Sequence, residues 1–212
     1  PCAAGGAADG AAASPAVAAA GAVAEAASAE AVAVWAEAAA PPAGGETAMT
    51  RWLRHLFTDR SAVQRRFPES TLTAIERAVK AAEATHAGQI RVVIEASLDG
   101  PRLWARETAA ERALEVFSLL RVWDTEHNNG VLIYLLLADR DVEIVADRGI
   151  HARCGQATWE AVCREMETAF RAGQFEAGVL AGVAAVGAHL ARHFPRTADS
   201  PVNELPDAPV LL

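Results

Sequence analysis

The most regular hydrophobic pattern in the chain lies between residues 128 and 150, NNGVLIYLLLADRDVEIVADRGI. Residues 131–137 form a continuous apolar run, which is typical of a strand with both faces covered. After the polar turn at residues 138–141, apolar residues alternate with others from Val142 to Ala146, as in a neighbouring strand with one wetter face. The pattern predicts two antiparallel strands joined by a tight turn, the first of them central in its sheet.

Further periodic segments surround this hairpin. Residues 89–96 (QIRVVIEA) are predicted to form another strand, and residues 103–120 a helix with Leu114 and Phe117 inward. Apolar residues at helical spacing predict one helix from residues 68–70 onward and a pair of helices after Ile150. The order strand, helix, strand implies a parallel pair with a right-handed crossover. The predicted fold class is α/β, a three-layer α/β/α sandwich with a small mixed sheet.

The hairpin has a recognisable sequence pattern, in which an NGVL strand start is followed by a short apolar strand, Asp-Arg in the turn, and a strand ending in Asp-Arg-Gly-Ile. This pattern resembles the TPM domain family. The resemblance covers roughly residues 68–195. Members include a chloroplast lumen protein, a photosystem II repair factor and an auxiliary protein of acetylcholine receptors. The resemblance implies weak acid phosphatase activity and calcium binding in loops at one sheet end. Because the members' roles differ so widely, it is a better guide to fold than to activity.

Composition divides the chain into four parts. Residues 1–48 are Ala-rich, contain no Lys or Arg, and are predicted to be a low-complexity segment that is disordered or not native. Residues 49–67 are basic and amphipathic, residues 68–195 form the TPM-like domain, and residues 196–212 form a Pro-containing extended tail after Pro195 ends the folded body. Because basic residues begin abruptly at Met49, two alternatives stay open: Met49 is the natural start, or the preceding segment is a real extension.

The basic segment has two interpretations. Its large apolar residues can share one helical face opposite Arg51 and Arg54. These residues are Trp52, Leu53, Leu56 and Phe57. Such a helix can make a weak contact with the surface of an anionic membrane. The favoured interpretation is that it packs on its own domain.

Candidate chemistry lies in the loops at the two ends of the sheet. If the first two strands are parallel, residues 97–100 lie beside the hairpin turn; otherwise they join the opposite end. The candidate catalytic residues are Asp99, Asp139, Arg140 and Asp141. The candidate binding surface at the other end consists of Asn128, Asn129, Asp147, Arg148 and His151. Carboxylates and an arginine suit phosphoryl transfer, but the sequence has no phosphate-cradling glycine loop.

Metal binding is the second interpretation of these loops. Asp139 and Asp141 are the candidate ligands of a hard cation such as Ca²⁺, and the alternative is that they solvate a turn. Where many TPM domains have Asp-Asn-Gly, this chain has Asn128-Asn129-Gly130, which removes one carboxylate. His189 and His193 stand four residues apart but lack a third ligand, so they are expected to be hydrogen-bonded or exposed histidines and not metal ligands. The GxxxG formed by Gly178 and Gly182 predicts close packing of a helix on the sheet.

These observations predict a non-catalytic accessory or interaction module that requires no cofactor. The alternative is a weak, metal-assisted, acid phosphatase-like hydrolase. The expected partner is a protein, which the roles of the family suggest could be a membrane protein. A net charge of −8 without a basic run gives no reason to expect nucleic acid. Three cysteines without a CxxC motif suit reduced thiols, so the expected compartment is the cytoplasm.

Overall fold

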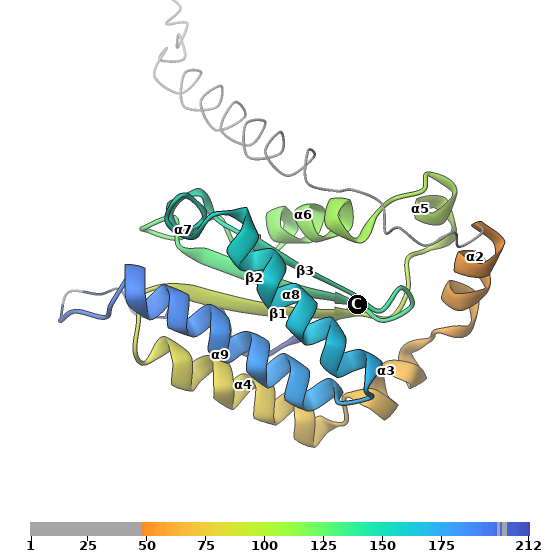
Figure 1. Ribbon diagram of the computed structural model, residues 1–212, viewed down its shortest axis with the longest axis horizontal. Coiled ribbons are helices and arrows are strands. Elements are labelled where there is room, and N and C mark those ends of the chain that lie inside the picture. Colours follow the sequence, from red (N-terminus) through yellow and green to blue (C-terminus); the bar gives the residue numbers. More distant parts are fainter. Residues whose placement is uncertain (1–47, 199, 201–202) are drawn as a thin grey trace, which may run out of the picture. The chain divides into compact units, whose positions relative to one another are not determined.

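The computed structural model describes residues 48–198, 200 and 203–212 (Figure 1). The predictions made for residues 1–47 fall outside this part of the chain and stay predictions. Within it, four strands form one mixed sheet in the order β3-β2-β1-β4. The strands are β1 (Gln89–Glu95), β2 (Gly130–Leu136), β3 (Asp141–Ala146) and β4 (Val210–Leu211). β2 pairs with β1 in parallel and with β3 antiparallel, which confirms the predicted hairpin and crossover.

Helices cover both faces of this sheet, so the predicted three-layer α/β/α sandwich is confirmed (Figure 1). The helices are α2 (Ala48–Phe57), α3 (Arg60–Arg66), α4 (Glu69–Glu83), α5 (Gly100–Trp104), α6 (Ala109–Leu119), α7 (Arg148–Cys154), α8 (Gln156–Arg171) and α9 (Phe175–His193). The buried apolar residues of α4, α8 and α9 pack with alternate residues of the strands on one face. α6 lies on the other face, over β2 and β3.

The central position of β2 follows from its sequence. All seven of its residues are buried, as a continuous apolar run requires. The register places Ile133 between Val92 of β1 and Ile144 of β3, and all three contribute to the same core. Trp159 of α8 is the largest fully buried side chain in that core.

The helix predicted over residues 103–120 is wrong in one respect, because the structure has two helices there. α5 ends at Trp104, and Arg106 takes a positive φ of 57°, which cannot continue a right-handed helix. α6 then begins at a capping box in which Thr108 and Glu111 satisfy each other's backbone N–H groups. In α6, Phe117 is buried as predicted and Val116 is buried with it, whereas Leu114 is only partly buried.

The chain does not leave the folded body at Pro195, contrary to expectation. Val210 and Leu211 of β4 pair in parallel with Val93 and Ile94 of β1. Without β4, this side of β1 would present a row of unpaired backbone groups. Side chains of β1 also hold the tail, because Gln89 Oε1 accepts the N–H groups of Glu204 and Leu205 at 2.9 and 3.0 Å.

Candidate functional site

The exit of β1 and the β2–β3 turn lie at the same end of the sheet, which we call the hairpin end. The Leu137 N–H donates to the Glu95 carbonyl and the Ala138 N–H to the Ala96 carbonyl, both at 3.0 Å. Parallel pairing of β1 and β2 therefore continues into the loops. Of the two placements left open by the sequence, the structure has Asp99 at the hairpin end, on the loop that follows β1.

At the hairpin end, Asp139 is bound by the polar face of α2. Arg51 Nε donates to Asp139 Oδ2 at 3.0 Å, and Arg54 Nη2 donates to Oδ1 at 3.0 Å. His55 Nε2 also lies 3.0 Å from Oδ1. The Asp139 carboxylate is thus held through both oxygens by three basic side chains. We call these four residues the Asp139 cluster.

His55 connects three parts of the chain. Its side chain is fully buried, and its Nδ1 accepts the Leu98 N–H at 3.0 Å. Because Nδ1 accepts, the proton sits on Nε2, which donates to Asp139. This tautomer joins α2, the loop after β1 and the hairpin turn. Burial pushes the pKa of Asp139 upward, but the hydrogen bonds from His55 and Arg51 outweigh it and hold the pKa at about 2.

The other predicted residues at this end have separate surroundings. Asp99 caps α5 by accepting the Arg102 N–H at 3.0 Å, and Arg140 is exposed in the turn with φ 56°.

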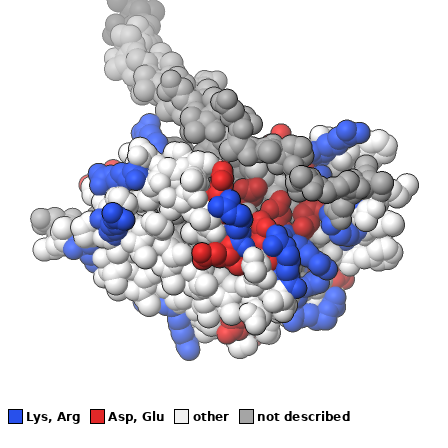
Figure 2. All heavy atoms as spheres, viewed as in Figure 1, with Lys and Arg blue, Asp and Glu red and all other residues white. Residues whose placement is uncertain are grey.

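Asp141 is the first residue of the edge strand β3. Burial, with the carboxylates of Glu167 and Asp139 nearby, raises its pKa to about 6. Glu143 follows on the same strand, and burial beside Asp141 raises its pKa to about 8. Figure 2 shows acidic and basic side chains lying side by side on one face of the molecule.

The opposite end of the sheet brings together the loop before β2 and the start of α7. Arg148 Nε donates to Asn128 Oδ1 at 3.1 Å, and the Asp147 N–H donates to the Gly130 carbonyl at 2.8 Å. The expectation that these two loops meet at a common sheet end is confirmed. The antiparallel pairing of β2 and β3 is the cause, since it sets the start of one beside the finish of the other.

The side chains of Asp147 and Asn129 at this end make hydrogen bonds to the backbone. Asp147 caps α7 through Oδ1, which accepts the Arg148 N–H at 2.7 Å, and burial raises the pKa of Asp147. Asn129 Nδ2 donates to the Ala87 carbonyl at 3.1 Å. Burial lowers the pKa of His151 on α7. Within the described part of the chain, Asn129 Oδ1 and Asp147 Oδ2 are buried without a hydrogen-bond partner.

Replacing Gly149 with alanine is expected to lower the free energy of unfolding by about 1–3 kcal/mol, because the new methyl group overpacks this end. An added Cβ would lie 2.5 Å from the Asn128 carbonyl oxygen and 2.8 Å from that of His127, and backbone atoms cannot swing aside. Urea denaturation measures the loss. Gly100→Ala is the matched control, since no atom lies within 4 Å of its added Cβ. Equal stabilities of the two variants would contradict the close approach of the loops.

Ca²⁺ takes six to eight oxygen ligands, and several of the candidate oxygens in the described part of the chain already accept hydrogen bonds from other side chains. At the hairpin end, both oxygens of Asp139 accept hydrogen bonds from basic side chains. At the other end, Asp147 is the one carboxylate among the predicted residues. Asn128 Oδ1 already accepts a hydrogen bond from the guanidinium of Arg148. The described residues contain no group of three or more His, Cys, Asp or Glu arranged to hold a metal ion.

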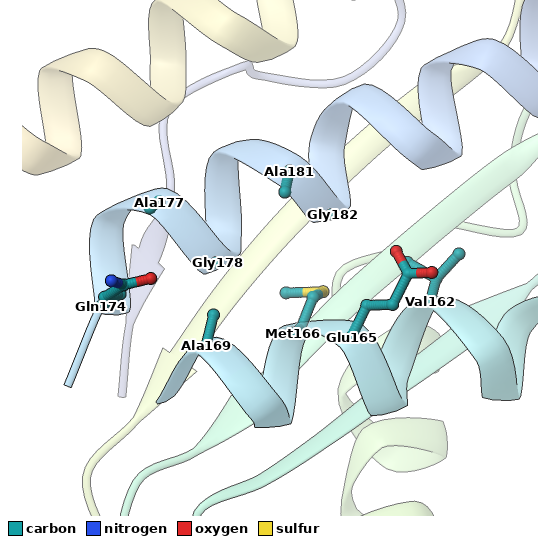
Figure 3. A pocket seen from close by; sticks show the side chains of 9 residues that line it. All are labelled: Val162, Glu165, Met166, Ala169, Gln174, Ala177, Gly178, Ala181 and Gly182. Atoms are coloured by element: carbon teal, nitrogen blue, oxygen red, sulfur yellow. The ribbon is translucent and has the colours of Figure 1, made fainter. Parts of the chain in front are cut away.

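A hollow of about 240 Å³ lies between α8 and α9 (Figure 3). Its lining is mostly small or apolar, with Glu165 as the one charged side chain. Here the GxxxG prediction is corrected, because Gly178 and Gly182 allow close approach to α8 rather than to the sheet. An added Cβ would lie 2.7 Å from the Phe170 ring at Gly178 and 2.3 Å from Met166 Sδ at Gly182. The hollow carries no constellation for catalysis.

His189 and His193 on α9 contact residues of the neighbouring helices α8 and α7. The His189 ring lies edge-on to the Trp159 ring, with centroids 5.8 Å apart. The main-chain carbonyl of His193 accepts a hydrogen bond from Arg153 at 2.7 Å. Burial lowers the pKa of His189. The ring contact gives the His189 side chain a packing partner, and the role of the His193 side chain stays a prediction.

The residue that sequence reasoning missed is His55. The apolar face of the basic segment was identified, and so were Arg51 and Arg54 opposite it, but no sequence pattern joins them to a turn more than eighty residues away. The available signal was the position of His55 beside Arg51 and Arg54 on the helical wheel, which makes one polar face of three basic groups.

Comparison with known proteins identifies the family. The family model described as TPM domain matches residues 64–189, more than half of the chain. The chain therefore belongs to the TPM domain family. No curated protein matches it.

Two solved structures share the fold. The BA42 protein from the psychrophilic bacterium Bizionia argentinensis, an NMR structure, is 29% identical, with a TM-score of 0.60 over 68% of this chain and 93% of that one. The N-terminal domain of a protein from P. gingivalis, also solved by NMR, is 20% identical, with a TM-score of 0.51 over 61% of this chain and 81% of that one. This second likeness concerns the fold alone.

Proposed function

We propose that this TPM domain is a non-catalytic accessory module that acts by binding another molecule. The observation that carries the proposal is the Asp139 cluster, in which side chains of α2 donate hydrogen bonds to both oxygens of the Asp139 carboxylate at the hairpin end. A nucleophile, a general base or a metal ligand needs an accessible lone pair. Releasing Asp139 would leave the fully buried side chain of His55 without its acceptor.

The proposed partner is a protein, with membrane proteins among the candidates that family membership suggests. The proposed compartment is the cytoplasm, since Cys154 and Cys163 are free thiols, which suits a reducing environment. A net charge of −8 argues against nucleic acid as the partner. None of the helices in the described ranges combines the length and the hydropathy needed to cross a membrane.

A second candidate function is a weak acid phosphatase, and the specific observation in its favour is Asp141. With its pKa raised to about 6, this carboxyl could hold a proton under mildly acidic conditions and donate it to a leaving group. Arg140 beside it could contact a phosphate. The Asp139 cluster supplies no nucleophile for this reaction, so the accessory module remains the better supported proposal.

The experiment that separates the two candidates is hydrolysis of p-nitrophenyl phosphate by the purified chain, assayed from mildly acidic to neutral pH. The expected result is no turnover above the uncatalysed rate, with wild type, Asp139→Asn and Asp141→Asn indistinguishable. Efficient hydrolysis that either substitution abolishes would overturn the accessory module and place an active site at the hairpin end.

Calcium titration of the same samples should give a dissociation constant on the order of 10⁻³ M or weaker. Asn128→Asp should tighten that binding, because a carboxylate attracts a hard cation more strongly than an amide does, and Asp139→Asn should not.

A further inference from the structure

The helix α2 is packed with its polar face toward the domain and its apolar face outward. Arg51 and His55 contact Asp139, whereas the apolar residues at spacing i, i+4, i+7 and i+8 point away from them. These exposed residues are Met49 (70%), Leu53 (47%), Leu56 (73%) and Phe57 (77%). A helix of a soluble domain ordinarily buries its apolar stripe. α2 does the reverse.

The exposed stripe continues onto α5. The rings of Trp52 and Trp104 meet edge to face with centroids 5.9 Å apart, and Trp104 is 78% exposed. A further contact fixes the two helices together, because Arg51 Nη2 donates to the Glu107 carbonyl at 2.7 Å. We call the patch formed by Met49, Leu53, Leu56, Phe57 and Trp104 the α2 face. Contiguous exposed apolar residues of this kind mark a binding surface.

The α2 face is held in place before any partner arrives. The Asp139 cluster and the hydrogen bond to Glu107 hold the polar side of α2 at several points. His55 adds a contact to the backbone of Leu98. A binding partner would therefore meet an ordered helix and would not have to offset the entropy of folding one.

Charge decides which partner the α2 face suits. Residues 48–67 carry five arginines and one acid, Asp59, in a chain of net charge −8. Arg51 and Arg54 pair with Asp139, which leaves three arginines against Asp59, a net charge of +2. Arg60 and Arg65 on α3 are exposed, as is Arg106 beside Glu107. Figure 2 shows basic side chains, with acidic ones among them, on the side of the molecule that carries α2 and α3, and further basic side chains on the opposite side. A second copy would bring the same positive charge to the interface, whereas an anionic surface would complement it.

We propose that the α2 face docks on an anionic lipid bilayer, with its apolar side chains inserted among the headgroups and the nearby arginines on lipid phosphates. This inference rests on the proposed binding function and names its target. Leu, Phe and Trp on one helical face with arginines beside them is the composition of interfacial helices. Tryptophan prefers the boundary between headgroups and acyl chains. The helix lies on the membrane and does not span it.

The test is co-flotation of the full chain with vesicles made of equal parts phosphatidylcholine and phosphatidylglycerol. We expect binding at low salt that weakens as salt screens the arginines, and little binding to pure phosphatidylcholine. Leu56→Glu combined with Phe57→Glu should reduce the partition coefficient at least about tenfold. Both side chains are exposed, so this variant should keep the circular dichroism spectrum of the wild type. Leu119→Glu, at a residue 68% exposed on α6, is the matched control and should bind as the wild type does.

Three outcomes would overturn the inference. The first is no flotation of the wild type, and the second is flotation that the double variant leaves unchanged. The third is a concentration-dependent dimer without vesicles, seen by light scattering and abolished by the double variant, which would assign the α2 face to a second copy. Hydrolysis of p-nitrophenyl phosphate is measured on the same preparation. Absent flotation without hydrolysis defeats this inference alone, whereas efficient hydrolysis defeats the proposed function.

Discussion

Replacing Arg112 with methionine is expected to lower the free energy of unfolding by about 3–5 kcal/mol, because it leaves a buried carboxylate without its counter-charge. Arg112 of α6 donates through Nε and Nη2 to the two oxygens of Glu95 at 2.9 and 3.2 Å. The hydroxyl of Tyr134 donates to the same carboxylate at 2.8 Å. The exposed fractions of Arg112, Glu95 and Tyr134 are 9%, 6% and 0%. This network joins α6 to the two central strands, so its loss should loosen one whole layer.

Denaturation by urea at neutral pH measures the change, and the surface pair of Arg164 and Glu160 supplies the control. Arg164 is 66% exposed and lies 3.6 Å from Glu160, so Arg164→Met should change stability by less than about 0.5 kcal/mol. Adding Glu95→Leu and Tyr134→Phe to Arg112→Met should recover at least half of the loss, since no charge then stays buried. If Arg112→Met costs no more than the control, the network does not carry this stability.

The sandwich could be predicted because its determinants are local. The continuous apolar run of β2 and the alternation in β3 act over seven and six residues, and the turn between them has its own chemistry. The break between α5 and α6 also has a local sequence signal, because Thr108 and Glu111 have the spacing of a capping box. The break was missed because the spacing of apolar residues alone predicts one continuous helix over residues 103–120.

The fourth strand had no comparable local signal. Val210 and Leu211 form β4 only because the edge of β1, more than a hundred residues earlier, offers unpaired backbone groups. Two strand residues that directly follow Pro209 do not predict pairing on their own. Pairing of this kind is a property of the assembled sheet and could not be derived from the tail.

The Asp139 cluster was beyond prediction for the same reason. The helical wheel of α2 separates a basic face from an apolar one, but it does not state which face contacts the domain. The general rule points to the apolar face, and the structure has the opposite. What decides is Asp139 on the hairpin turn, whose carboxylate lies close enough to accept hydrogen bonds from both Arg51 and His55.

Replacing Asp139 with asparagine is expected to lower the free energy of unfolding at neutral pH by about 2–3 kcal/mol, because two arginines and a buried histidine lose their shared carboxylate. The Asp139 side chain is 11% exposed, so solvent screens the cluster little. The loss should be concentrated in α2. Hydrogen exchange should quicken at the Leu98 amide, which donates to His55, and through residues 51–57.

The pH dependence of that loss identifies the carboxylate as its source. The pKa of Asp139 is about 2 in the folded chain and near the usual 3.8 when unfolded. Stability from a lowered carboxyl pKa is present above the unfolded value and is lost as the pH falls through the folded one. The difference in stability between wild type and Asp139→Asn should therefore be largest at neutral pH, about 2 kcal/mol or more, and should shrink steadily from about pH 4 to about pH 2.

Asp124→Asn is the matched control, because Asp124 is an exposed acid outside the cluster, and it should leave stability unchanged across the range. A difference between Asp139→Asn and wild type that persists undiminished at about pH 2 would show that packing, and not the charge of Asp139, holds α2 on the domain.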